Sequence, residues 1–214
     1  MESTNYQKLI RNFITQNEAD LILNWVENID TVGGDPNYHL SHLSEELKGS
    51  ANIFDISQNT LTKYITKFQS TSKVLTEELP DFIHDIIKRI SHSINLPTDN
   101  IFLQVVDQRK GGKIGMHYDA SLNGYINYKC NLCILSEPYK FYMDKISIDV
   151  NPLDLYCFEA SLYKHWTDEF KSRRVFLSFG FIIPYSVTGR TDDDPRVRLS
   201  KRIEKYFQSN LANQ

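Results

Sequence analysis

Hydrophobic residues recur at helical spacing through much of the first half of the chain. In NEADLILNWVENI (17–29), the apolar side chains fall on one stripe, and Asn17 is placed to cap the helix. A second helix is predicted over SQNTLTKYITKF (57–68). A third is predicted over PDFIHDIIKRISHSI (80–94), which has Pro80 near its start. The polar stretch VGGDPNYHLSH, within residues 31–50, has the glycine and proline content of a loop.

The pattern changes near residue 99. Short runs rich in β-branched and aromatic residues now alternate with turn residues, as expected of strands. The predicted strands are IFLQVVDQR (101–109), YKCNLCIL (128–135), KFYMDKISIDV (140–150), DLYCFEA (154–160) and RVFLSFGFII (174–183). Strands at this spacing predict a β-sandwich or barrel. The helical pattern returns in RVRLSKRIEKYF (196–207), after the polar run TGRTDDDP.

These patterns predict one α+β domain that spans residues 1–214 and has a mainly β core. Its expected parts are a helical N-terminal support over 1–98, the core over 99–186 and a tail with a short helix over 187–214. A chain of 214 residues is long enough to bury one sizeable core. The sequence contains no internal repeat and no clear linker that would argue for a second domain.

Composition narrows the functional classes. With a net charge of -3, the chain lacks the basic excess typical of proteins that bind duplex nucleic acid, so that class is disfavoured. An odd count of 3 cysteines gives no disulfide framework and favours a reducing compartment. The start, MESTNYQKLIRNF, lacks an apolar secretion signal, and no run approaches the roughly 20 apolar residues of a membrane span. A cytoplasmic protein without a membrane span is therefore expected.

His117 and Asp119 stand one residue apart in GGKIGMHYDA, and His165 follows much later in YKHWTDEF. A strand places residues i and i+2 on the same face, so His117 and Asp119 would project together. Two imidazoles and one carboxylate bind one side of a metal and leave its other positions open, as in non-heme Fe(II) sites that activate oxygen. A single H-x-D arises often by chance, so other features of the sequence must support this interpretation.

The last predicted strand, residues 174–183, supplies one such feature. Alternation puts Arg174, Phe176 and Ser178 on one face, and Arg173 on the other face with residues such as Phe179. An inward guanidinium with a hydroxyl further along the same face makes a clamp for a carboxylate. The face of Arg173 is otherwise apolar, which suits packing against helices. Arg174, rather than Arg173, is therefore the candidate for a site.

Gln104, Val106 and Gln108 share one face of the strand that precedes the H-x-D. A buried glutamine needs hydrogen-bond partners, which a cosubstrate or substrate would provide inside a barrel. The same pattern fits an edge strand whose glutamines face water. Both interpretations stand at this point.

Taken together, the residues resemble the Fe(II)- and 2-oxoglutarate-dependent dioxygenase superfamily. Its pattern is H-x-D, a long gap, then His and a basic residue near the start of the last core strand. Here the pattern reads His117-Tyr118-Asp119, His165 and Arg174. The segment GGKIGMHYD is similar to the prolyl-hydroxylase-like and AlkB-like branches, with Gly111 and Ile114 at the matching positions. The resemblance covers about residues 100–185.

The resemblance implies a double-stranded β-helix (jelly-roll) core, with the N-terminal helices packed on one sheet. It implies Fe(II), 2-oxoglutarate and O2 as the reacting partners, and hydroxylation of a C–H bond with release of succinate and CO2. The substrate would be a small molecule, an amino acid or a protein side chain. The site residues that it implies are His117, Asp119 and His165 for the metal, with Arg174, Ser178, Gln108 and Gln104 for the cosubstrate.

Departures from the family pattern weigh against one branch. AlkB-like proteins carry Asn and Tyr where this chain has Val106 and Gln108, and Gly180 stands where they have a second arginine. A nucleic-acid oxidative demethylase is therefore the alternative enzyme, and a non-catalytic β-barrel binding module is the alternative of another class. Asp119 stands where a small residue would open a halide site, so halogenation is disfavoured.

Overall fold

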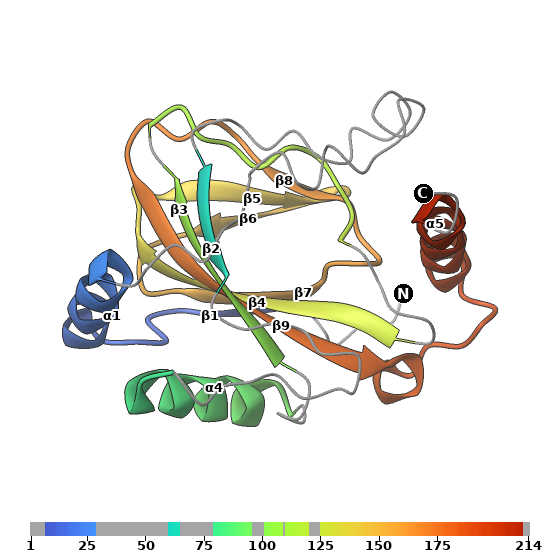
Figure 1. The fold of residues 1–214 in the computed structure, drawn as a ribbon, viewed down its shortest axis with the longest axis horizontal. Helices are drawn as coiled ribbons and strands as arrows, with labels where there is room; N and C mark the ends of the chain where they lie inside the picture. Colours follow the sequence, from blue (N-terminus) through green and yellow to red (C-terminus); the bar gives the residue numbers. More distant parts are fainter. Residues whose placement is uncertain are drawn as a thin grey trace.

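The computed structural model describes residues 7–28, 60–64, 79–95, 101–108, 110–119 and 125–211. Two antiparallel β-sheets face each other, and a small number of helices lies outside them (Figure 1). The predicted loop within residues 31–50 lies outside the described residues. The fold is thus β-rich with antiparallel sheets and few helices, as the strand pattern after residue 99 predicts.

The larger sheet has six strands in the order β1-β7-β4-β9-β3-β2, and every neighbouring pair is antiparallel. Its strands are β1 (Lys8–Ile10), β2 (Thr60–Tyr64), β3 (Ile101–Gln108), β4 (Tyr125–Leu135), β7 (Leu155–Glu159) and β9 (Arg174–Pro184). The long central strands β4 and β9 are paired from Tyr125↔Pro184 to Leu135↔Val175. Because nearly every residue of β9 is buried, this strand forms the middle of the core.

The smaller sheet has three strands in the order β6-β5-β8, with β5 (Tyr139–Met143), β6 (Ile146–Val150) and β8 (His165–Thr167). The run KFYMDKISIDV is therefore a hairpin and not one strand. At the turn, Asp144 takes a left-handed conformation with φ 47°, which ends β5 and lets the chain reverse into β6. The alternation of side chains in the sequence does not reveal this turn. The sheets pack through aromatic rings, since Phe141 of β5 lies 4.7 Å from Tyr156 and 4.8 Å from Phe158 of β7.

Within the described ranges, three α-helices accompany the sheets: α1 (Gln16–Asn28), α4 (Asp81–Ile94) and α5 (Pro195–Leu211). Helices α1 and α4 lie on the side of the larger sheet that faces away from β5, β6 and β8, whereas α5 stands at the opposite end of the molecule from α1 (Figure 1). The buried stripes of the first two join the core through the residues Ala19, Ile22, Val26, Ile83, Ile86, Ile87 and Ile90. These helices and α5 confirm the helical patterns of the sequence.

The start of α1 differs from the prediction. Thr15, and not Asn17, caps the helix in a reciprocal capping box with Glu18. The Glu18 backbone amide donates to Thr15 Oγ1 at 3.3 Å, and the Thr15 amide donates to Glu18 Oε2 at 2.8 Å. A T-x-x-E pattern satisfies two orphan amides at once, which a lone asparagine side chain does not.

The predicted helix over residues 57–68 is wrong within its described part. Residues 60–64 form β2, which pairs with β3 from Thr60↔Gln108 to Tyr64↔Gln104. The sequence TLTKY contains β-branched threonines at alternate positions, as strands often do. So short a segment does not distinguish the 3.6-residue period of a helix from the two-residue period of a strand. Together, β1 and β2 show that residues before 99 also contribute strands to the larger sheet. No helix in the described part of the chain is long and apolar enough to cross a membrane.

Candidate metal centre

Two backbone segments far apart in the sequence meet at His117 and His165. The two residues form an isolated antiparallel bridge, in which the His165 amide donates to the His117 carbonyl at 2.9 Å and the His117 amide donates back at 3.2 Å. Two residues further on, the Asp119 amide donates to the Ala160 carbonyl at 3.0 Å. These bonds fix the backbone that carries all three predicted metal ligands.

The bridge brings the three side chains together. The Nε2 atoms of His117 and His165 lie 3.2 Å and 3.7 Å from the same oxygen, Oδ1 of Asp119. The candidate ligand atoms all lie within 4.8 Å of one another, which is close enough for one ion to contact each of them. His165 is 3% exposed, so water competes poorly for this ligand. The donor set, two imidazoles and one carboxylate, fits a non-heme Fe(II) site.

Both imidazoles are held in the orientation that a metal requires. Nδ1 of His117 lies 2.7 Å from the Gly115 carbonyl, and Nδ1 of His165 lies 3.0 Å from the Tyr163 carbonyl. A carbonyl only accepts, so each Nδ1 carries the proton and each Nε2 keeps its lone pair for a metal. The backbone therefore selects the ligand tautomer before any ion binds.

Electrostatics favour the ligand forms of Asp119 and His165. Burial opposes ionisation of Asp119, but the ammonium of Lys129 favours the carboxylate, and the pKa of this carboxyl lies well below its usual range. For His165, burial acts first and the His117 ring second, and together they lower its pKa to about 3. At neutral pH the site therefore offers a carboxylate and a neutral imidazole, which are the states that bind a divalent ion.

Arg174 occupies the interior at the other end of the candidate site. It is 0% exposed, and its guanidinium lies over the rings of Phe176, Tyr139 and Phe170 at 4.0, 4.2 and 4.6 Å. Its hydrogen bonds go to neutral groups: Gln108 Oε1 at 2.8 Å, the Tyr139 hydroxyl at 2.5 Å and the Tyr156 hydroxyl at 3.0 Å. Among the residues that the structure describes, no carboxylate forms an ion pair with it.

Buried polar atoms without hydrogen-bond partners occur in this guanidinium and on β9 and β4. Within the described residues, Arg174 Nε, Ser178 Oγ and Asn131 Oδ1 are buried and have no hydrogen-bond partner. Ser178 stands opposite Asn131 in the β4–β9 pairing, and Gln104 stands opposite Ser178 in the β3–β9 pairing. A buried positive charge with an unused donor of its own, and an unused hydroxyl on the same face of its strand, is an environment that an anionic ligand would complete.

The metal candidates and Arg174 face one aromatic interior. The His165 ring lies 4.7 Å from Phe158 and 6.0 Å from Phe141, and Phe141 in turn lies 4.7 Å from the ring of Tyr156. The Tyr156 hydroxyl then accepts from Arg174. A chain of direct contacts thus connects the two ends of the candidate site.

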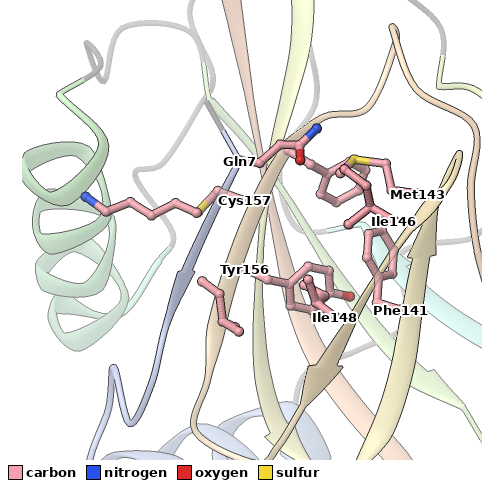
Figure 2. A pocket seen from close by; sticks show the side chains of 10 residues that line it. Gln7, Phe141, Met143, Ile146, Ile148, Tyr156 and Cys157 are labelled. Carbon is pink, nitrogen blue, oxygen red and sulfur yellow. The ribbon is translucent and has the colours of Figure 1, made fainter. Parts of the chain in front are cut away.

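A separate cavity of about 200 Å³ opens between β1, β7 and the β5–β6 hairpin (Figure 2). Phe141 and Tyr156 line it together with aliphatic side chains such as Ile146 and Ile148. Among the described residues that line it, Cys157 is the one common metal ligand, and a single ligand does not make a metal site. It adjoins the candidate site through one layer of aromatic rings.

Three contributors to the candidate site are absent from the sequence prediction: Tyr139, Tyr156 and Lys129. The two tyrosines reach Arg174 across strands, and their sequence neighbours are typical of ordinary buried strands. Lys129 pairs with Asp119 at 2.8 Å. A signal for it exists in YINYKCNLCIL, where Asn127, Lys129 and Asn131 alternate along an otherwise apolar strand.

The turn that supports the metal candidates is held by the C-terminal segment. Residues 159–163 include the carbonyls that accept from Asp119 and from His165 Nδ1. Arg190 binds both carboxylate oxygens of Glu159, one at 2.8 Å, and donates to the Tyr163 hydroxyl at 3.1 Å. The side chain of Glu159 is 0% exposed and that of Arg190 is 8% exposed. The ion pair is therefore a buried one.

Replacing Arg190 by methionine should lower the free energy of unfolding by about 3–5 kcal/mol, because Glu159 would keep an uncompensated buried charge. Urea denaturation of the purified variant measures this change. Lys201→Met is the matched control, since Lys201 forms an exposed ion pair with Asp192 in the same segment; its stability should not change measurably. A loss below about 1 kcal/mol in Arg190→Met would contradict the role of the pair.

Comparison with known proteins identifies the fold. The sequence matches no protein-family model and no curated protein. A viral collagen prolyl hydroxylase of Paramecium bursaria Chlorella virus-1, in complex with 2-oxoglutarate, aligns with a TM-score of 0.50 at 14% identity over 83% of this chain and 95% of that chain. A Pseudomonas putida prolyl-4-hydroxylase aligns with a TM-score of 0.51 at 11% identity over 82% of this chain and 91% of that chain.

A further similar structure is HygX from Streptomyces hygroscopicus with nickel and 2-oxoglutarate bound. Its TM-score is 0.54 at 11% identity, over 85% of this chain and 84% of that chain. At these identities the likeness concerns the fold. The chain thus shares the β-rich fold of these proteins over most of its own length and of theirs.

Proposed function

We propose that the chain is an Fe(II)- and 2-oxoglutarate-dependent oxygenase with a double-stranded β-helix (jelly-roll) core, which hydroxylates a C–H bond. The observation that carries this proposal is the pairing of two unusual features in one interior. One is the cluster of His117, Asp119 and His165, and the other is the fully buried Arg174 without an acidic partner among the described residues. A metal completes the first, and the far carboxylate of 2-oxoglutarate completes the second.

In the proposed site, each residue has a role that follows from its surroundings. His117 and His165 present Nε2 to the metal because their Nδ1 atoms donate to backbone carbonyls. Asp119 supplies the negative charge. Bound Fe(II) and 2-oxoglutarate supply the oxygen-activating chemistry, with succinate and CO2 as coproducts. The protein contributes orientation and exclusion of water.

Arg174 and Ser178 bind the far carboxylate of the cosubstrate in this proposal. The unused Nε of Arg174 and the unused Oγ of Ser178 are donors that a carboxylate would accept from. Gln108 is already bonded to the guanidinium, so its role is to orient Arg174 and not to bind the cosubstrate directly. Gln104 stays a candidate for a contact further along the same face.

The substrate class is the finer part of the proposal. HygX has also been solved with hygromycin B bound, and two other similar structures are prolyl hydroxylases. These names fit a small molecule, an amino acid or a protein side chain as the substrate of a related oxygenase. We propose these substrate classes for the present chain. Nucleic acid is a weaker candidate, because a net charge of -3 does not favour binding to a phosphate backbone.

The test of the function is formation of succinate. Purified protein with Fe(II), ascorbate and 2-oxoglutarate should form succinate slowly even without a substrate, because uncoupled turnover needs only the metal and the cosubstrate. His117→Ala should reduce the rate to background, since it removes one of the metal ligands. Succinate from the wild-type protein no faster than from His117→Ala, together with absence of metal binding, would refute the oxygenase proposal.

A further inference from the structure

The carboxylate of Asp119 has different partners on its two oxygens. Oδ1 lies 3.2 Å from His117 Nε2 and 3.7 Å from His165 Nε2, on the side where a metal would bind. Oδ2 lies 2.8 Å from Nζ of Lys129 and accepts a longer bond, at 3.5 Å, from Nδ2 of Asn127. One oxygen thus faces the other metal candidates, and the second is held by a cation from a different strand.

Lys129 reaches this position because of its place in the sheet. It lies in the middle of β4, opposite Gly180 of β9 and Phe158 of β7. Gly180 has no side chain, so the lysine side chain has no neighbour on that strand to displace it. The side chains of Lys129 and Asp119 are 15% and 9% exposed. A nearly buried ammonium is costly to leave without a carboxylate, so the contact has a strong reason to persist.

We propose that Lys129 is a positioning residue of the metal centre, which retains Oδ2 of Asp119 so that this residue binds the metal through Oδ1 alone. Carboxylates bind divalent ions through one oxygen or two, and the choice depends on what else holds the second oxygen. A second carboxylate oxygen on the metal would occupy a position that the cosubstrate or oxygen needs. The inference rests on the oxygenase function proposed above and specifies how its site stays open.

Lys129→Met tests this role, because methionine has a similar length and no charge. The probe is Mn(II), and the measured quantity is the number of exchangeable water molecules on the bound ion, obtained from water-proton relaxation. We expect the variant to bind Mn(II) with about one water fewer than the wild-type protein, since Asp119 becomes bidentate. We also expect its affinity for 2-oxoglutarate, titrated in the presence of Mn(II), to fall about 10-fold or more.

Two further variants separate positioning from simple stabilisation. Lys129→Arg keeps a cation beside Oδ2 and should restore the wild-type water number. Lys140→Met is the matched control, because Lys140 forms an exposed ion pair with Asp149 on the neighbouring sheet and should change neither quantity. If Lys129→Met does not fold by circular dichroism, Lys129→Ala provides the same comparison by removing the side chain beyond Cβ.

The outcomes distinguish this inference from the function on which it rests. Failure of the wild-type protein to bind Mn(II) would overturn both the metal centre and the role of Lys129. Normal Mn(II) binding with an unchanged water number and unchanged 2-oxoglutarate affinity in Lys129→Met would overturn the role of Lys129 alone. A variant that merely loses thermal stability, with both site readouts unchanged, counts as that second outcome.

Discussion

Replacing Arg174 by alanine should weaken 2-oxoglutarate binding about 100-fold or more, whereas replacing the adjacent Arg173 should leave it near the wild-type value. A hydrogen bond to a charged group contributes roughly 1.5–3 kcal/mol, and Nε of Arg174 is the donor that is left unused for the cosubstrate. Because about 1.4 kcal/mol is tenfold in affinity, losing one such bond at the upper end of this range accounts for about 100-fold. Titration of 2-oxoglutarate into protein loaded with Mn(II) measures the dissociation constants.

Arg173 is a suitable control because the structure gives it another task. It donates to both carboxylate oxygens of Asp107, at 3.0 and 2.9 Å, and to Glu27 of α1 at 3.1 Å. Its side chain is 40% exposed. Arg173→Ala therefore loosens a contact between α1 and the sheet without touching the interior.

Arg174→Lys is the companion variant for the case in which the alanine variant is too unstable to titrate. It keeps the charge but loses the fork that makes paired bonds, so it should bind 2-oxoglutarate more weakly than wild type and more strongly than Arg174→Ala. Stronger dependence on Arg173 than on Arg174 would mean that the cosubstrate does not bind at this guanidinium.

Replacing His165 by alanine should abolish detectable binding of Mn(II) or Co(II). The loss should exceed the roughly 10–100-fold change that removal of an outer partner of a metal ligand causes, because a ligand itself is lost. Thermal unfolding with and without the ion gives a second readout. At an ion concentration about 100 times the dissociation constant, the wild-type protein should gain about 2.7 kcal/mol of stability, and the variant should gain none.

His92→Ala provides the matched control, since His92 is an exposed histidine on α4. It should bind the ion as the wild-type protein does. Equal stabilisation of the wild-type protein and His165→Ala by the ion would place metal binding elsewhere on the molecule and remove the basis for the proposed centre.

Strand alternation made one part of the candidate site predictable. The rule that side chains alternate across a strand separates Arg174 from Arg173, and the structure agrees, with 0% exposure for Arg174 and a 40% exposed side chain for Arg173. It also puts Ser178 on the same face as Arg174. The three metal candidates were predicted from residue type and spacing, and the bridge between His117 and His165 explains how they meet.

Other parts depend on contacts that no local pattern encodes. Tyr139 binds Arg174 from β5 of the facing sheet, and Tyr156 binds it from β7, which is separated from β9 by β4 in the same sheet. The sequence specifies neither the contact between the sheets nor the order of strands within the larger one. Strand β8 has only 3 residues, too few for a periodic signal. The sequence pattern predicts a helix where β2 lies, because pairing with β3 decides the conformation of these residues and local propensity is a weak guide in such short segments.

The bridge between His117 and His165 has a consequence for how the protein opens. The same two residues exchange backbone hydrogen bonds and present their imidazoles to one point. Separating the two segments would therefore pull the imidazoles apart, so fraying of this part of the sandwich and release of an ion are one event. A bound ion would form a reversible cross-link between residues 117 and 165. Slow hydrogen exchange at the backbone amides of His117 and His165 would indicate that the bridge between them stays intact.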